Sequence, residues 1–329
     1  MTKTLSKFLD GLLFFVLVAL SLILCFNKAL SLAVIDGFKL WFACVLPSVF
    51  PYFFITAIMT GLSFTGKISR FLSPFTKRLF NTGGITGYAF FISLISGYPV
   101  GAKTVADLKE NNLLGEAEAI RASTFCSTSS PMFLISSVGS IMFNSATFGL
   151  VLFLVHFLSA ILMGITFSFY KRKEKPLSLV SAVRDEKINL SLYETTFSAV
   201  TSVLVVGGLI TVFYILTEVL LSVRILVPLV SVLEKLLGDK TLAEGIVFGI
   251  LETTRGYKAV SGCGINFLTL PVCAFFCGFG GLSVIAQSLA YLKKAKIKTA
   301  PFILSKILQA VLSFVLGLIF SSIFFGGVF

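Results

Sequence analysis

The chain has 329 residues, of which 56% are hydrophobic and only 13% are charged. A soluble domain carries roughly 25% charged residues and has too little interior to hide this much apolar surface. The composition therefore excludes a soluble protein, a disordered chain and a disulfide scaffold. It predicts an all-α protein that crosses a membrane several times.

The net charge of +12 does not by itself indicate a nucleic-acid partner. Basic residues gather near the N-terminus and at 67–78, 171–187 and 293–298, always between apolar runs. Short cytoplasmic loops show this excess of Lys and Arg, whereas a nucleic-acid binder needs a contiguous basic face. We therefore expect the lipid bilayer, and no nucleic acid, as the surrounding partner.

The motifs of common enzymes and metal sites are missing from the sequence. There is no G-x-S-x-G, no His-rich metal motif and no carboxylate pair on one apolar helix face. The single histidine, His156, lies in an apolar run without an acidic neighbour, so we expect a buried, satisfied side chain rather than a ligand. The sequence predicts a protein that is not an enzyme and that holds no metal or cofactor.

Crossing the hydrocarbon core takes about 20 apolar helical residues. In chain order, the full-length candidates are 9–27, 37–64, 146–170, 192–222 and 299–327. The first could be a signal peptide, but Asp10 and the lack of an A-x-A site favour an uncleaved span. Two further stretches, 115–145 and 264–292, are interrupted by small polar residues, so we expect two discontinuous helices.

Segments 84–111 and 241–262 have apolar arms that are too short to cross. They are interrupted by Gly97-Tyr98-Pro99-Val100-Gly101 and by Thr253-Thr254-Arg255-Gly256. We expect both to be re-entrant helical hairpins, which survive at membrane depth only inside protein or beside a wet cavity.

The loop charges give one consistent topology. With the N-terminus in the cytoplasm, seven crossings and two hairpins leave every basic segment inside and the C-terminus outside. The order of span, hairpin, broken helix and span then occurs twice with opposite orientation, which is an inverted repeat. We expect an N-terminal helix in 1–35, a first repeat in 36–170, a cytoplasmic linker in 171–191 and a second repeat in 192–329.

Two short sequence patterns that occur once in each half support the repeat. Residues 101–105 and 256–260 share the pattern G-x-K-x-V, one in each hairpin. Residues 125–130 and 276–281 share F-C-small-x-small-small, one at each helix break.

Broken helices expose free N–H groups at one half-helix and free C=O groups at the other. The hydroxyl run Ser127, Thr128, Ser129 and Ser130 precedes Pro131, which favours an anion cradle over simple helix packing. The mirror-related Gly278, Gly280 and Gly281 either let a substrate approach the backbone or serve close packing.

Charged residues near the hairpin tips are the sharper signal. A cation at mid-bilayer costs about 2.5–3.5 kcal/mol on insertion scales, so Lys103, Arg255 and Lys258 are expected to face protein or water. Arg255 could hold a substrate carboxylate bidentately, and Glu252 either pairs with it or carries a coupling proton. Lys103 could equally lie at the cytoplasmic surface, and Glu218 is expected to reach the membrane interface.

The segments Gly97-Tyr98-Pro99-Val100-Gly101-Ala102-Lys103 and Cys126-Ser127-Thr128-Ser129-Ser130-Pro131 resemble the YlbJ-type sporulation integral membrane proteins. That family belongs to the nucleoside-recognition, or Gate-domain, superfamily. The resemblance implies a fold similar to the concentrative nucleoside transporters. In endospore formers it also implies movement of dipicolinate across the mother-cell-derived outer forespore membrane. On that implication Gly97, Tyr98, Pro99 and Gly101 join the substrate-site candidates.

The sequence thus predicts an alternating-access transporter in the cell membrane for a small carboxylate, with dipicolinate first. A proton or a sodium ion would be the coupling partner, and a homo-oligomer is compatible with the sequence. The alternatives are a nucleoside or nucleobase transporter of the same fold and a non-transporting membrane assembly factor in sporulation. Arg255 distinguishes the carboxylate transporter from the nucleoside transporter, because a nucleoside would not need an arginine.

Overall fold

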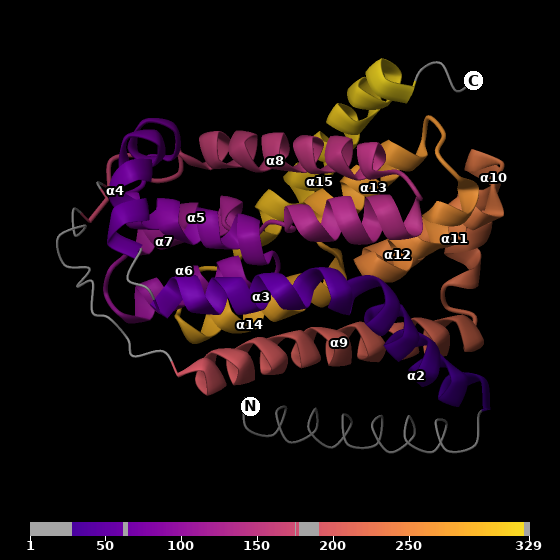
Figure 1. Ribbon diagram of the computed structural model, residues 1–329. Coiled ribbons are helices and arrows are strands. Elements are labelled where there is room, and N and C mark those ends of the chain that lie inside the picture. Colours follow the sequence, from indigo (N-terminus) through magenta and orange to yellow (C-terminus); the bar gives the residue numbers. More distant parts are fainter. Residues whose placement is uncertain (1–27, 62–64, 175, 178–190, 326–329) are drawn as a thin grey trace, which may run out of the picture.

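The computed structural model describes residues 28–61, 65–174, 176–177 and 191–325. All regular structure in these residues is helical (Figure 1). The expected first span, 9–27, lies outside the described residues. The first half of the chain contains α2 (Lys28–Leu40), η1 (Trp41–Val45), α3 (Leu46–Gly61), α4 (Thr65–Phe75), η2 (Thr76–Phe80), α5 (Gly84–Ser96), α6 (Val100–Glu110), α7 (Glu116–Phe125), η3 (Phe133–Met142) and α8 (Ala146–Phe167). The second half contains α9 (Leu192–Ser222), α10 (Val227–Leu237), α11 (Lys240–Leu251), α12 (Thr253–Val260), η5 (Ser261–Cys263), α13 (Thr269–Phe279), α14 (Gly281–Lys294) and α15 (Ala300–Phe325).

Five stretches among the described residues are long and apolar enough to cross a membrane. They are Leu30–Ile55, Ala146–Phe167, Leu192–Ser222, Thr269–Lys294 and Ala300–Phe325. A sixth would result if the bent pair Thr65–Phe80 and Gly84–Ser96, which meet at 98°, were one span. The all-helical, multi-span character predicted from the composition is confirmed.

The first described span starts earlier than the sequence pattern indicated. We expected it at 37–64, but the helix runs without a gap from Lys28 through η1 to Gly61. Asp36 and Lys39 are one helical turn apart and lie on an exposed face, with their charged groups 3.9 Å apart. Leu30 and Ala33 on the other face are buried, so these charges do not interrupt the helix.

Two pairs of short helices lie towards opposite ends of the molecule. In Figure 1, α5 and α6 lie towards one end and α11 and α12 towards the other, while α9 runs along most of the length between them. Helices α11 and α12 pack backbone to backbone, because a Cβ on Gly256 would fall on the Cα of Gly249. This approach requires glycine at 256, and Gly249 is required by the Phe276 ring of α13, on which its own Cβ would fall.

An aromatic cluster fixes the end of α7 against α5. The ring centroid of Phe125, the last residue of α7, lies 4.3 Å from that of Phe80 and 5.6 Å from that of Phe90. All three side chains are buried. The cluster holds the point where α7 ends, which positions the polar segment that follows.

Gly256→Ala should destabilise the fold. The added methyl would overlap the backbone of Gly249 and press on the buried Phe276 ring, and overpacking of this kind costs about 1–3 kcal/mol. The matched control is Gly208→Ala in α9, where a Cβ would meet no atom within 4 Å. Thermal unfolding in detergent should show a lower Tm for Gly256→Ala and an unchanged or higher Tm for the control. Equal Tm values for the two variants would contradict this packing.

Candidate functional site

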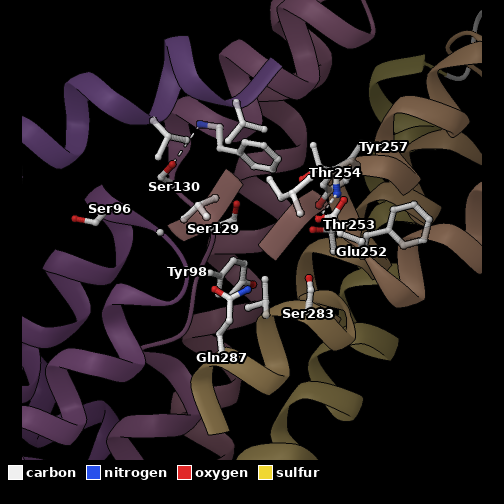
Figure 2. Close-up of a pocket in the computed structure, with 18 residues that line it drawn as sticks. Ser96, Tyr98, Ser129, Ser130, Glu252, Thr253, Thr254, Tyr257, Ser283 and Gln287 are labelled. Atoms are coloured by element: carbon white, nitrogen blue, oxygen red, sulfur yellow. Dashed lines mark hydrogen bonds between the residues drawn. The ribbon is translucent and has the colours of Figure 1, made fainter. Parts of the chain in front are cut away.

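A central pocket of about 80 Å³ lies where several helices begin (Figure 2). Its wall includes Gly97 and Tyr98 before α6, Ser129 and Ser130 at the first break, Glu252, Thr253 and Thr254 at the start of α12, and Ser283 and Val284 in the first turn of α14. The first N–H groups of a helix have no intrahelical partner and carry partial positive charge. Four such helix starts therefore contribute to one hydroxyl-lined pocket.

The first break is held open by hydrogen bonds to its backbone. The chain leaves α7 at Phe125 and becomes helical again at Pro131, as the hydroxyl run predicts. The Ser93 hydroxyl accepts from the backbone N–H of Thr128 at 3.0 Å. The Ser93 and Thr128 hydroxyls also form a hydrogen bond with each other at 2.8 Å. His156 Nε2 accepts from the N–H of Ser129 at 2.9 Å, which places the ring proton on Nδ1. His156 is fully buried, as predicted, but only Nε2 is hydrogen-bonded, since Nδ1 has no partner among the described residues.

The tip between α5 and α6 reaches across to the other half of the chain. The bond between Tyr98 and Pro99 is cis, and Gly97 has a φ of 76°. The Tyr98 hydroxyl donates to the carbonyl oxygen of Cys277 in the last turn of α13 at 2.6 Å. A Cβ on Gly101 would overlap the carbonyl oxygen of Cys126, so α6 begins directly against the first break.

The tip between α11 and α12 is a single residue, Glu252. We expected the interruption at 253–256, but these residues already form the first turn of α12. The reason is the Glu252 carboxylate, which accepts from the N–H groups of Thr254 at 3.0 Å and Arg255 at 2.7 Å. A carboxylate at this position caps the helix and starts it early.

Arg255 points away from the pocket and towards α9. Its guanidinium forms an ion pair with Glu218 and donates to the carbonyl oxygen of Tyr214 at 3.2 Å. The rings of Tyr214 and Phe248 lie 4.0 Å and 4.2 Å from its central carbon. Glu252 contacts Arg255 through the backbone N–H, so the side-chain pair considered from the sequence is replaced by one with Glu218, which we had placed at the membrane interface.

A larger cavity of about 670 Å³ adjoins the central pocket, because Ser96, Val206 and Gln287 line both. Pro99 and Lys103 lie in its wall, together with Asp107 and Glu194. We call this cavity the vestibule. It lies beside α6 and the N-terminal half of α9, whereas Glu218 belongs to the C-terminal half of α9 and Arg255 contacts it there.

Comparison with known proteins places this architecture in a family. A family model described as "Nucleoside recognition" (Gate) matches residues 42–148, which contain the first short-helix pair and the first break. The sporulation integral membrane protein YlbJ of Bacillus subtilis strain 168 is 30% identical over 302 residues, covering 84% of this chain and 73% of that protein. The chain belongs to the YlbJ family. No solved structure gave a significant match. The protein is therefore an integral membrane protein, and the resemblance read from its motifs is confirmed.

The structure gathers part of the predicted site of this YlbJ-family protein and disperses the rest. Gly97, Tyr98, Ser129, Ser130, Glu252, Thr253 and Thr254 line the central pocket. Ser127 and Thr128 are buried behind its wall, and Lys258 is exposed. Gly278 packs against α15, while Gly280 and Gly281, at φ of 86° and 71°, form the second break.

Sequence reasoning missed several wall residues and one buried cation. Tyr257, Ser283 and Gln287 line the pocket but lie in regular helices, where no breaker marks them. Lys306 is 1% exposed in α15, and its Nζ donates to the carbonyl oxygen of Ser127 at 2.5 Å. A lysine within an apolar span is a recognisable signal, because intramembrane charges are costly and usually functional.

The pair between Arg255 and Glu218 should appear as a coupling energy. Groups in direct contact show about 0.5–3 kcal/mol of interaction in double-mutant cycles. We expect a value within this range for Arg255→Met and Glu218→Gln, measured by SDS unfolding in detergent micelles. The Glu218 side chain is 31% exposed, which screens the pair and favours the lower half of the range. Additive losses would show that α9 and α12 are held together by other contacts.

Proposed function

We propose that this YlbJ-family protein is a membrane transporter that moves a small organic anion by alternating access, without acting as an enzyme. Dipicolinate is the first candidate substrate, and spore formation, named in the description of the Bacillus relative, is the proposed setting. The proposal rests on one observation, the four helix starts that meet at the hydroxyl-lined pocket.

Helix N-termini favour carboxylates for a physical reason. Aligned peptide dipoles leave roughly half a positive charge at each N-terminus, and the free N–H groups there donate to anionic oxygens. Transporters with discontinuous helices bind substrate carboxylates in this manner. The α12 N-terminus is already occupied by the Glu252 carboxylate. The other three starts bring Tyr98, Ser129, Ser130 and Ser283 to the pocket wall.

The arrangement of short helices supports an inverted repeat with two re-entrant hairpins. The pairs α5/α6 and α11/α12 approach the pocket from opposite ends of the molecule (Figure 1). Each pair is followed by a helix that breaks at the pocket, α7 to η3 and α13 to α14. In the proposed topology the N-terminus is cytoplasmic and the basic loops face inward.

The vestibule and the Arg255–Glu218 pair suggest how the two ends alternate. The vestibule adjoins the pocket on the side that the charge rule assigns to the cytoplasm. At the other end, Arg255 ties α12 to α9. We propose that the structure corresponds to an inward-facing state, and that release of this pair accompanies opening to the outside. A proton or sodium gradient would supply the energy.

A nucleoside or nucleobase is the second candidate substrate. The observation that favours it is the exclusion of Arg255 from the pocket wall, where the groups present include Glu252 and the amide of Gln287. A carboxylate and an amide are suited to sugar hydroxyls and base edges.

Uptake into proteoliposomes separates these functions. We expect the wild-type protein to accumulate dipicolinate at least about tenfold faster than the uncharged pyridine-2,6-dicarboxamide, a preference worth about 1.4 kcal/mol. Uridine should not compete. Rapid uridine uptake without dipicolinate uptake would support the second candidate. Failure to transport either solute would point to a membrane assembly factor.

A further inference from the structure

A buried lysine lies next to the central pocket without an anionic partner. Lys306 Nζ donates to the Ser127 carbonyl oxygen at 2.5 Å and to Gln309 Oε1 at 3.1 Å. Both acceptors are neutral. No carboxylate of the described residues lies within ion-pair distance of this amine, since the ion pairs found there involve other cations. A buried ammonium without a counter-ion is unfavourable, so one should be supplied from elsewhere.

None of the groups in contact with Lys306 among the described residues carries a full negative charge. On α8, His156 uses Nε2 to accept from the backbone and is therefore neutral in the bonding shown. On α13, Cys277 accepts from the Tyr98 hydroxyl through its carbonyl oxygen. On α15 itself, the neighbours are the ring of Phe302 and the amide of Gln309. The partial negative charge at the end of α7 is the compensation that this packing provides.

Tyr98 links the lysine to the pocket. Lys306 Nζ lies 5.3 Å from the centre of the Tyr98 ring, and Tyr98 is part of the pocket wall. One side chain therefore separates the ammonium from the space that a ligand would occupy. In surroundings this apolar, an anion in the pocket would interact with the ammonium far more strongly than in water.

We propose that Lys306 determines the charge preference of the central pocket, and that the carboxylate of the transported anion is its missing counter-ion. This inference rests on the function proposed above. The positive charge of Lys306 acts on the ligand across the Tyr98 ring, although Lys306 does not itself line the pocket. Lys306 is therefore a specificity-determining residue. It also stabilises the first break through the Ser127 carbonyl, and the test must separate these two roles.

The test compares a charged and an uncharged solute of the same shape. Lys306→Gln removes the charge but keeps a donor for the Ser127 carbonyl. In proteoliposomes we expect this variant to take up dipicolinate at least about tenfold more slowly than the wild type, while uptake of pyridine-2,6-dicarboxamide changes less than about twofold. A purely structural lysine predicts an equal loss for both solutes, which would overturn the proposal. A preference for the dianion as strong as in the wild type would also overturn it.

Two control variants keep the charge. Lys306→Arg should retain the preference for dipicolinate over the diamide. Gln309→Leu removes the hydrogen bonds of this amide to Lys306 and to Ser159 but leaves the ammonium, so the ratio of the two uptake rates should stay near that of the wild type. If Gln309→Leu lost the preference as fully as Lys306→Gln, the shared network rather than the charge would be responsible, and the proposal would fail.

The wild-type protein provides the test if Lys306→Gln does not yield monodisperse protein. In protein carrying ¹⁵N at the lysine side chains, with the Lys306 signal assigned through Lys306→Arg, dipicolinate should shift the Nζ resonance of Lys306 and the diamide should not. Equal shifts with both solutes, or binding of dipicolinate without any shift, would contradict the proposal. Failure of the proposed function is recognised separately, because then the wild type itself would show no dipicolinate uptake.

Discussion

The structure depends on providing hydrogen-bond partners for the backbone N–H and C=O groups that the helix breaks leave unpaired inside an apolar molecule. Within a bilayer an unpaired N–H or C=O group costs several kcal/mol, so irregular backbone persists only where protein groups or water complete its hydrogen bonds. Around the first break, buried side chains perform this task. Ser93 accepts from Thr128, and His156 accepts from Ser129. These polar residues in apolar helices are therefore required by the break, whatever ligand the pocket takes.

The two ends of each broken helix are treated differently. The N-termini of the half-helices, which carry partial positive charge, contribute to the pocket wall. The carbonyl groups at their C-termini accept hydrogen bonds from side chains of the opposite half of the chain. Lys306 donates to the carbonyl of Ser127 after α7, and Tyr98 donates to that of Cys277 in α13. Each half thus completes a break in the other half. This division leaves positive potential for a ligand and removes the competing negative ends from the pocket.

Local patterns were enough to predict helices and breaks but not the partners across them. Apolar runs, Gly97–Pro99 and the serine run before Pro131 indicated the short arms and the first break, because breakers and hydrophobicity act locally. Arg255 bonds to Glu218 and Lys306 bonds to Ser127, which lie 37 and 179 positions away in the chain, so no spacing rule reveals these two contacts. The start of α12 was misplaced because a single capping carboxylate, Glu252, decided it.

The G-x-K-x-V pattern shared by the two halves is explained by packing rather than by ligand chemistry. Its two glycines, Gly101 and Gly256, each stand where a side chain would overlap backbone, at Cys126 in one case and Gly249 in the other. Its two lysines, Lys103 and Lys258, are both exposed, and neither lines the central pocket. The pocket wall instead takes Tyr98 from one tip and Glu252 from the other, which are chemically unlike. The two halves therefore share the geometry that brings a short arm to the centre, while the groups they present there differ. That asymmetry gives the pocket a polarity, with an ammonium beside Tyr98 and the helix-capping carboxylate of Glu252 on the other side. A ligand with a fixed arrangement of charge would therefore bind it in one orientation.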